Sequence, residues 1–306
     1  MYLRVSVTDR CNLRCTYCLP EDAHFAPSRV TPDELDRLMA VICASVSVTK
    51  IRLTGGEPTL CPSLTQHIRT AAWLVPTVGL TTNGVVLERL LPELREAGLN
   101  RLNISLDAAE PEGFRRATRH DRFAAVLGSI RAAKRAGFTP LKINAVASVD
   151  TDPAALARLA IAEGFHLRFI ELMDIGVAHA DWAGRHVPAS ALRERLEQAG
   201  VAIAEAPDRD EPTSRVWTVN GVDPAATTLG FITTVTSPFC ATCDRIRLTS
   251  QGRLHTCLFD ERGVDLLPLL RADDLVGLDA AIRQAVGAKS PPPRFQRSGI
   301  MAGIGG

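Results

Sequence analysis

Six short apolar or β-branched runs, separated by helical segments, constrain the fold of this 306-residue chain more than any other feature. Strands that alternate with helices predict a parallel sheet, either curved into an incomplete barrel or open and doubly wound. The doubly wound alternative calls for a phosphate-binding fingerprint, and neither G-x-G-x-x-G nor G-x4-G-K-[ST] occurs. The predicted strands are Leu3–Val7, Ile51–Thr54, Val78–Thr81, Arg101–Ser105, Leu141–Val146 and His166–Ile170.

Helix signals between these runs agree with the alternation. Thr31–Glu34 reads as a capping box with proline at the first helical position, and the apolar residues after it fall on one helical face. Those residues are Leu35, Leu38, Met39 and Ile42. Further helix ends are predicted at Gly98, Gly137 and Gly164.

Polar residues end or follow each predicted strand. In a barrel of parallel strands these segments share one face, which is where such folds carry their chemistry. The segments are Thr8–Cys18, Gly55–Glu57, Thr81–Gly84, Ser105–Asp107, Asn144 and Glu171–Met173.

The first of these segments holds Cys11, Cys15 and Cys18 in a C-x3-C-x2-C pattern. Thiolates are the ligands that iron–sulfur clusters require, so this loop can hold three corners of a 4Fe–4S cube. The next cysteine is Cys43, which leaves one iron without a protein ligand and open to a small molecule. Zinc is the alternative, with His24 as its fourth ligand.

A second trio, Cys240, Cys243 and Cys257, also lacks a fourth cysteine. It indicates a second open cluster, and a zinc site completed by His255 is the alternative.

Arg245 and Arg247 lie inside the second trio and alternate as on a strand, so they are expected to face the same side. Paired guanidinium groups suit phosphate oxygens. A solvated strand face is the alternative.

The βα pattern changes after about residue 186. A helix at Ala189–Gln198 precedes a polar stretch, residues 206–215, that is expected to be a surface loop or boundary. Strand-like runs follow at Val216–Val219 and Leu229–Val235, and Ser290–Pro293 reads as a linker to a short tail. The predicted division is residues 1–205 and residues 206–306.

Composition narrows the class of protein. A net charge of +1 argues against a general nucleic-acid binder. The first residues turn polar before a secretory signal can form, and the apolar stretch around Leu38–Val48 is too short to span a membrane. Eight cysteines in metal-type clusters predict a cytoplasmic protein. Cys43, on the apolar helix face, is expected to be buried.

Several motifs together resemble the GTP 3′,8-cyclase family of molybdenum cofactor biosynthesis, which belongs to the radical S-adenosylmethionine (SAM) superfamily. They are LRVSVTDRCNLRCTYCLP, IRLTGGEPTL, LTTNG, NISLD, LKINAV, RFIELMD and PFCATCDRIRLTSQGRLHTCLF, with a terminal Gly-Gly. The resemblance implies an α/β fold: an incomplete (β/α)6 radical-SAM-type barrel with a C-terminal extension that carries a second iron–sulfur cluster.

The resemblance also implies two 4Fe–4S clusters, SAM and GTP, each with its own residues. The first cluster falls to Cys11, Cys15 and Cys18, and the second to Cys240, Cys243 and Cys257. SAM contacts are implied for Tyr17, Gly55, Gly56, Glu57, Ser105 and Met173. GTP contacts are implied for Arg4, Arg52, Thr81, Lys142, Arg245 and Arg247, and catalytic roles for Arg245, Arg247, Gly305 and Gly306.

The activity so implied is conversion of GTP to (8S)-3′,8-cyclo-7,8-dihydroguanosine 5′-triphosphate by a 5′-deoxyadenosyl radical. Its partners would be a cellular electron donor, the downstream cyclic pyranopterin monophosphate synthase and a second copy in a homodimer, with no nucleic acid or membrane. Two other readings remain open: a peptide-modifying radical SAM enzyme with an auxiliary cluster, and a non-enzymatic iron–sulfur electron carrier.

The chain departs from the family pattern at three points. It begins at Met1, where the family usually carries further residues, which bears on one wall of the site or on the dimer contact. Cys61 replaces an arginine, and Asp244 stands where asparagine is common. At the other end, the tail through Gly305 and Gly306 is expected to reach the barrel mouth, and a frayed end is the alternative.

Overall fold

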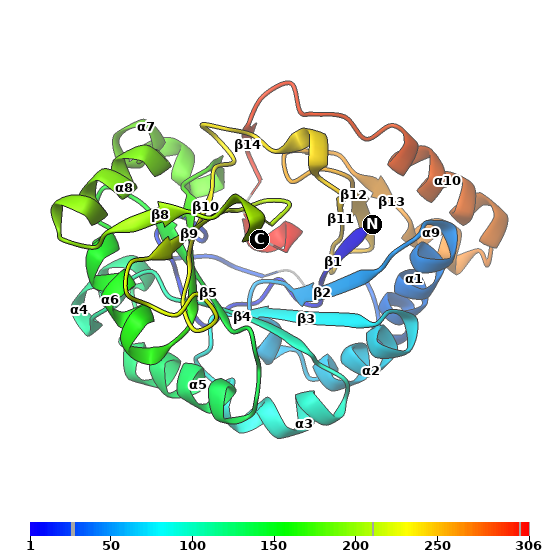
Figure 1. The fold of residues 1–306 in the computed structure, drawn as a ribbon. Helices are drawn as coiled ribbons and strands as arrows, with labels where there is room; N and C mark the ends of the chain where they lie inside the picture. The colour runs from blue at the N-terminus through cyan, green and yellow to red at the C-terminus, as the bar shows by residue number, and fades with distance from the viewer. Residues whose placement is uncertain (26–27, 210, 300, 306) are drawn as a thin grey trace.

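A computed structural model describes residues 1–25, 28–209, 211–299 and 301–305. Six parallel strands lie side by side in chain order and form the curved core of the molecule (Figure 1). All six lie at the predicted places, so the incomplete barrel is confirmed. They are β1 Tyr2–Ser6, β2 Lys50–Thr54, β3 Thr77–Thr82, β4 Arg101–Ser105, β5 Lys142–Ala147 and β6 His166–Glu171.

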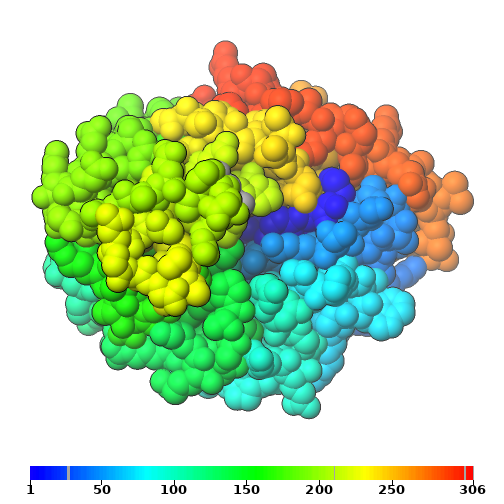
Figure 2. All heavy atoms as spheres, in the orientation of Figure 1, coloured from blue at the N-terminus to red at the C-terminus, as the bar shows by residue number. Residues whose placement is uncertain are grey.

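The C-terminal part of the chain extends this sheet at both edges. β10 (Leu229–Ile232) pairs parallel with β6, and β11 (Arg245–Leu248) pairs parallel with β1. Figure 2 shows the segment that contains β11 against the blue N-terminal strand. Antiparallel strands complete the 12-stranded sheet: β9 and β8 beyond β10, and β12 and β13 beyond β11. Their bounds are β8 Ile203–Glu205, β9 Arg215–Val219, β12 Arg253–His255 and β13 Val264–Asp265.

Helices cover the outer face of the sheet (Figure 1). The capping box is present at the first helix: Thr31 accepts from the Glu34 amide while the Glu34 carboxylate accepts from Thr31. Gly98, Gly137 and Gly164 follow helix ends with positive φ, as predicted. The helices are α1 Pro32–Ser45, α2 Leu64–Leu74, α3 Leu91–Glu96, α4 Pro111–Thr118, α5 Phe123–Arg135, α6 Pro153–Glu163, α7 Trp182–Arg185, α8 Ala189–Gln198, α9 Leu267–Arg271 and α10 Leu275–Gly287.

The two faces of the sheet differ sharply in polarity. Because side chains alternate along a strand, the ladder register sorts them into an outer apolar row and an inner polar row. The outer row packs under the helices and is almost fully buried. It contains Leu3, Val5, Ile51, Leu53, Val78, Leu80, Leu102, Ile104, Ile143, Ala145, Leu167 and Phe169. The hydrophobic core therefore lies between sheet and helices, and the inner face is left for ligands.

The last residues return to the open side of the barrel. β14 (Gln296–Arg297) pairs with β7 (Asp174–Ile175), and a 3-10 turn, Met301–Ile304, follows. The red end of the described chain lies in the middle of the barrel in Figure 1. The boundary predicted at residue 205 falls at the end of β8 and stays a prediction. Among the described helices, none combines the length and the apolar character needed to cross a membrane.

Candidate functional site between two cysteine trios

The first cysteine trio lies on the loop that leaves the carboxyl end of β1. The backbone after β2 clasps this loop: the Gly56 amide donates to the Thr8 carbonyl at 2.7 Å and the Glu57 amide to the Arg10 carbonyl at 2.7 Å. A Cβ at Gly56 would lie 2.3 Å from the Arg10 oxygen, and one at Gly55 2.3 Å from the Thr8 oxygen. Only glycine permits this close approach, so the pair positions the cysteine loop.

Glu57 is a brace between loops. Its buried carboxylate accepts from the Thr82 hydroxyl at 2.6 Å, the Asn83 amide at 2.6 Å and the Thr59 amide at 3.0 Å. Burial raises the pKa of this carboxyl, and the hydrogen bonds oppose the rise. The side chain thus locks the loops after β2 and β3 together, and its contact with SAM stays a prediction.

The predicted SAM residues Tyr17, Ser105 and Met173 lie on the cysteine loop, at the end of β4 and after β6, as the barrel arrangement requires. The structure adds Asp107, which accepts from the Tyr17 hydroxyl at 2.9 Å and from the Val146 amide at 2.8 Å. Burial raises the pKa of Asp107 to about 6. Asp107 follows Ser105 in the NISLD motif, and its place after a strand was the available signal.

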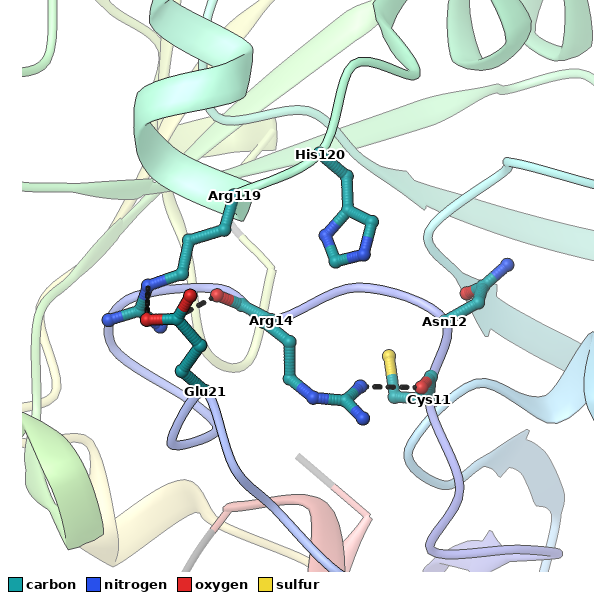
Figure 3. A pocket seen from close by; sticks show the side chains of 6 residues that line it. All are labelled: Cys11, Asn12, Arg14, Glu21, Arg119 and His120. Atoms are coloured by element: carbon teal, nitrogen blue, oxygen red, sulfur yellow. Dashed lines mark hydrogen bonds and ion pairs between the residues drawn. The ribbon is translucent and has the colours of Figure 1, made fainter.

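A polar cavity of about 440 Å³ lies beside Cys11 and is lined by Asn12, Arg14, Glu21, Arg119 and His120 (Figure 3). Arg14 donates to the Cys11 carbonyl at 2.8 Å, and Arg119 donates to the Arg14 carbonyl at 3.0 Å. The bond from Arg119 holds the cysteine loop against the end of α4. His24, the alternative fourth ligand, is exposed.

The second cysteine trio is assembled from two separate segments. Cys240 and Cys243 precede β11, and Cys257 follows β12, which returns antiparallel to β11. Lys289 ties the segments by donating to the Arg245 carbonyl at 2.8 Å and to the Thr256 carbonyl.

At both trios, burial and the neighbouring cysteines raise the pKa of a thiol. Burial and then Cys257 and Cys243 raise the pKa of Cys240. Burial, Asp107, Cys18 and Cys11 raise the pKa of Cys15.

Each trio thus brings three cysteines together. Three thiolates would repel one another unless a cation lay among them, which fits the chemistry of an iron–sulfur cluster. Among the described residues no three His, Cys, Asp or Glu side chains form a single-ion site. The imidazole of His255 is buried and bonded to the Asp260 carbonyl at 2.9 Å.

The two trios lie at opposite ends of the same pair of strands. β1 and β11 run parallel with Tyr2 opposite Arg245, so Cys243 lies near the start of β1 and Cys11 beyond its end. Five residues of strand separate the two ends by about 15 Å. The inner face of the sheet spans this gap.

That inner face is strongly cationic. The basic side chains that the register places on it include these seven: Arg4, Lys50, Arg52, Lys142, Arg168, Arg245 and Arg247. Arg52, Arg168 and Arg247 are only 4–6% exposed. A solvated strand face is therefore the wrong reading of Arg247. Lys50 and Arg168 also belong to this set, although neither was predicted to contact GTP.

Tyr2 lies among these cations. Its hydroxyl accepts from Arg52 Nε at 2.6 Å, and the Lys50 ammonium lies 4.8 Å from the ring centroid. Burial alone would raise the pKa of Tyr2, but the charges of Arg52, Arg4, Arg245 and Lys50 lower it to about 7. Thr81, also predicted to contact GTP, lies 3.5 Å from Arg52 Nη1.

The polar stretch at residues 206–215 also reaches this face. Glu211 forms ion pairs with Lys142 and with Arg168, the latter at 3.0 Å. Thr213 accepts from Arg245 at 2.5 Å. The expectation of a simple surface loop is thus wrong for Glu211 and Thr213.

The tail lies on the inner face, so a frayed end is wrong for its described part. The Gly305 carbonyl accepts from Arg247 at 2.7 Å and from Arg4 at 3.4 Å. Ala302 and Ile304 are buried, and Ala302 bonds to Cys18 through its backbone. The tail therefore connects the first trio with the arginines near the second. Gly306 lies outside the described residues.

The points of departure occupy different surroundings. Cys61 is half-buried against the core, and Cys43 is likewise half-buried, less than predicted. Asp244 is exposed, and its carbonyl accepts from the Tyr2 amide at 3.0 Å.

Comparison with known proteins agrees with this architecture. Residues 5–149 match the Radical SAM superfamily and residues 165–294 match Molybdenum Cofactor Synthesis C. SuiB of Streptococcus suis shares the fold, with a TM-score of 0.57 at 14% identity over 90% of this chain and 66% of SuiB.

Curated relatives are far more similar in sequence. The GTP 3′,8-cyclase of Mycolicibacterium smegmatis is 39% identical over 99% of this chain and 89% of its own length. That of Streptomyces coelicolor is 40% identical over 89% of this chain and 81% of its own length. With this similarity over nearly its whole length, the chain belongs to the GTP 3′,8-cyclase family of radical SAM proteins.

Proposed function

We infer that this protein converts GTP to (8S)-3′,8-cyclo-7,8-dihydroguanosine 5′-triphosphate, in molybdenum cofactor biosynthesis. The observation that carries this inference is the row of seven cations between two cysteine trios. A row of this charge matches a triphosphate, since charge-assisted bonds from arginine and lysine are the strongest available to phosphate oxygens. A peptide-modifying enzyme or an electron carrier has no evident use for it.

The cofactors divide between the two ends of the strands. Cys11, Cys15 and Cys18 would hold one 4Fe–4S cluster, and Cys240, Cys243 and Cys257 the other. When bound, the clusters and SAM supply the electron, the radical and an open iron for the guanine. Tyr17, Gly55, Gly56, Glu57, Ser105 and Met173 are proposed to surround SAM.

The chain itself binds, orients and shields the nucleotide. Arg4, Arg52, Thr81, Lys142, Arg245 and Arg247 are proposed to contact GTP, together with Lys50 and Arg168. Contacts at several points fix the ribose relative to SAM, and positioning of this kind supplies much of a catalyst's power.

The tail is proposed to complete the site. Its position between Cys18 and Arg247 suits a segment that separates SAM from water and sets the ribose position. Gly305 contributes its carbonyl, and Gly306 is proposed to act beside it.

Further partners are proposed on chemical grounds. Reductive cleavage of SAM needs a cellular electron donor, and the cyclised nucleotide is the substrate expected for cyclic pyranopterin monophosphate synthase. A homodimer and a cytoplasmic location, where free thiols persist, complete the proposal.

The decisive experiment is anaerobic incubation of the reconstituted protein with GTP, SAM and a strong reductant, followed by chromatographic separation and fragmentation mass spectrometry of the nucleotide, because the expected product is an isomer of GTP. We expect a cyclised triphosphate with the mass of GTP and one 5′-deoxyadenosine per turnover. Unaltered GTP beside steady SAM cleavage would refute the assignment of the substrate.

A further inference from the structure

The cationic inner face has a carboxylate of its own. Among the described residues, Glu211 is the one carboxylate in ion-pair contact with the seven basic side chains. It bridges Lys142 on β5 and Arg168 on β6, adjacent strands that both face the interior. Its side chain is 32% exposed, whereas that of Arg168 is 5% exposed. The carboxylate is therefore more open to solvent than the guanidinium with which it pairs, so an incoming ligand can reach it.

Glu211 is ionised under all ordinary conditions. Burial would raise the pKa of its carboxyl, but the charges of Arg168 and Lys142 lower it to about 2. Those cations face further positive charge, because Lys50 also acts on Lys142. Without an anion here, like charges on neighbouring strands would repel one another.

The segment around Glu211 is held on both sides of the barrel mouth. The next residue, Pro212, accepts through its carbonyl from the Thr242 hydroxyl at 3.1 Å, beside the second cysteine trio. Thr213 accepts from Arg245. The backbone of this segment forms a tight turn. The Glu211 amide donates to the Ser214 carbonyl at 2.9 Å, and the Ser214 amide donates to the Glu211 carbonyl at 3.1 Å. The turn thus spans from β5 and β6 to β11, across the opening.

We propose that Glu211 is a resident counter-ion that a phosphate group of the substrate displaces from Lys142 and Arg168. This inference rests on the proposed function, since it names what replaces the carboxylate. In the free protein, Glu211 pairs with Lys142 and Arg168. This pairing keeps bulk anions away from the two side chains and holds them in place. On binding, the carboxylate gives up two cations, and a ligand must carry enough negative charge to compensate. Glu211 then weakens the binding of every ligand whose phosphate must displace it, and it leaves nucleosides, which carry no phosphate to replace the carboxylate, unaffected.

The test compares Glu211→Gln with Asp208→Asn, an exposed residue three positions earlier that loses the same charge. Binding of inorganic tripolyphosphate, GTP, ATP and guanosine to the anaerobically reconstituted full chain is measured by calorimetry. We expect Glu211→Gln to bind tripolyphosphate and GTP roughly tenfold more tightly, about 1.4 kcal/mol, because the competing anion is gone. Guanosine affinity and the Asp208→Asn protein should match wild type.

Equal or weaker tripolyphosphate binding by Glu211→Gln would overturn the proposal, because Glu211 would then position the cations. Failure of the wild-type protein to prefer GTP over ATP would instead count against the proposed substrate, whichever way Glu211→Gln behaves. Thermal unfolding is a second readout. Glu211→Gln should unfold at lower temperature than wild type without ligand and gain more from tripolyphosphate. An equal gain in both proteins would also overturn the counter-ion role.

Discussion

The two cysteine trios offer the same kind of ligand, but the chain brings their members together in different ways. Cys11, Cys15 and Cys18 belong to one short loop at the carboxyl end of β1, clasped by the backbone of Gly56. The trio of Cys240, Cys243 and Cys257 lies at the other end of the same strands and needs β12 to bring its members together. One site is encoded locally and the other exists only once the C-terminal region has folded. In the proposed function this difference also separates the chemistry, with SAM at one end and the nucleotide at the other.

Removing one cysteine from each trio should break this comparison most strongly. Cys18→Ala should abolish formation of 5′-deoxyadenosine, because SAM then has no reducing centre. Cys257→Ala should abolish the cyclised nucleotide while slow, uncoupled SAM cleavage continues. Both products can be quantified by liquid chromatography. Normal amounts of cyclised nucleotide from Cys257→Ala would contradict the role given to the second trio.

The tail between the two ends offers the next largest effect. A Cβ at Gly305 would lie 2.7 Å from Thr54 Cγ2, and the residue has a φ of +67°. Gly305→Ala should therefore displace the tail and reduce cyclised product on the order of a hundredfold, because small errors in position are costly. SAM cleavage should change much less. Gly303→Ala is the matched control, since nothing lies within 4 Å of its added carbon. Equal rates in both variants would leave the tail without a role.

Arg247 tests whether the nucleotide belongs to the second end. Arg247→Ala should weaken GTP binding by ~1.5–3 kcal/mol, the range for hydrogen bonds to charged groups. SAM affinity, measured separately, should stay close to wild type. Arg247→Lys should restore only part of the loss, because an ammonium cannot reproduce the planar fork. Exposed Arg262→Ala is the control. A parallel loss of SAM and GTP binding would indicate general damage instead.

A buried pair that lies outside both cysteine sites should affect the stability of the fold and leave ligand binding unchanged. His67 on α2 contacts Asp36 on α1 at 2.6 Å. Burial would lower the pKa of His67, but Asp36 and Cys61 raise it from 6.5 to about 9. The pair therefore stabilises the fold fully below pH 6.5, and this stabilisation is lost as the pH rises through about 9.

Between about pH 6 and about pH 9.5, the free energy of unfolding measured in urea should fall by about 2–3 kcal/mol more for wild type than for His67→Gln. Exposed His24→Gln should follow wild type at both values. An identical pH dependence in wild type and His67→Gln would refute the assignment, and GTP affinity should be unchanged throughout.

Local features of the fold could be predicted from the sequence, and long-range pairings could not. The six strands and the capping box at Thr31 depend on residues close in the chain. The pairing of β11 with β1 joins residues more than 240 positions apart, and no local pattern announces it. Arg168 could have been predicted to face the barrel interior. It lies two residues after His166, as Asn144 lies two residues after Lys142 on the neighbouring strand, and side chains two positions apart on a strand share a face. Glu211 could not have been predicted to do so, since its charge suggested a solvated loop.

The row of seven cations has a consequence for protein engineering. Placing like charges on adjacent strands is unfavourable without a ligand, so this surface holds the fold below the stability its core would permit. Replacing Lys50 with a neutral residue should raise the melting temperature even as nucleotide binding is weakened. A screen that selects for heat resistance alone would thus discard the groups on which function depends. Selection for this protein should be carried out with the nucleotide present.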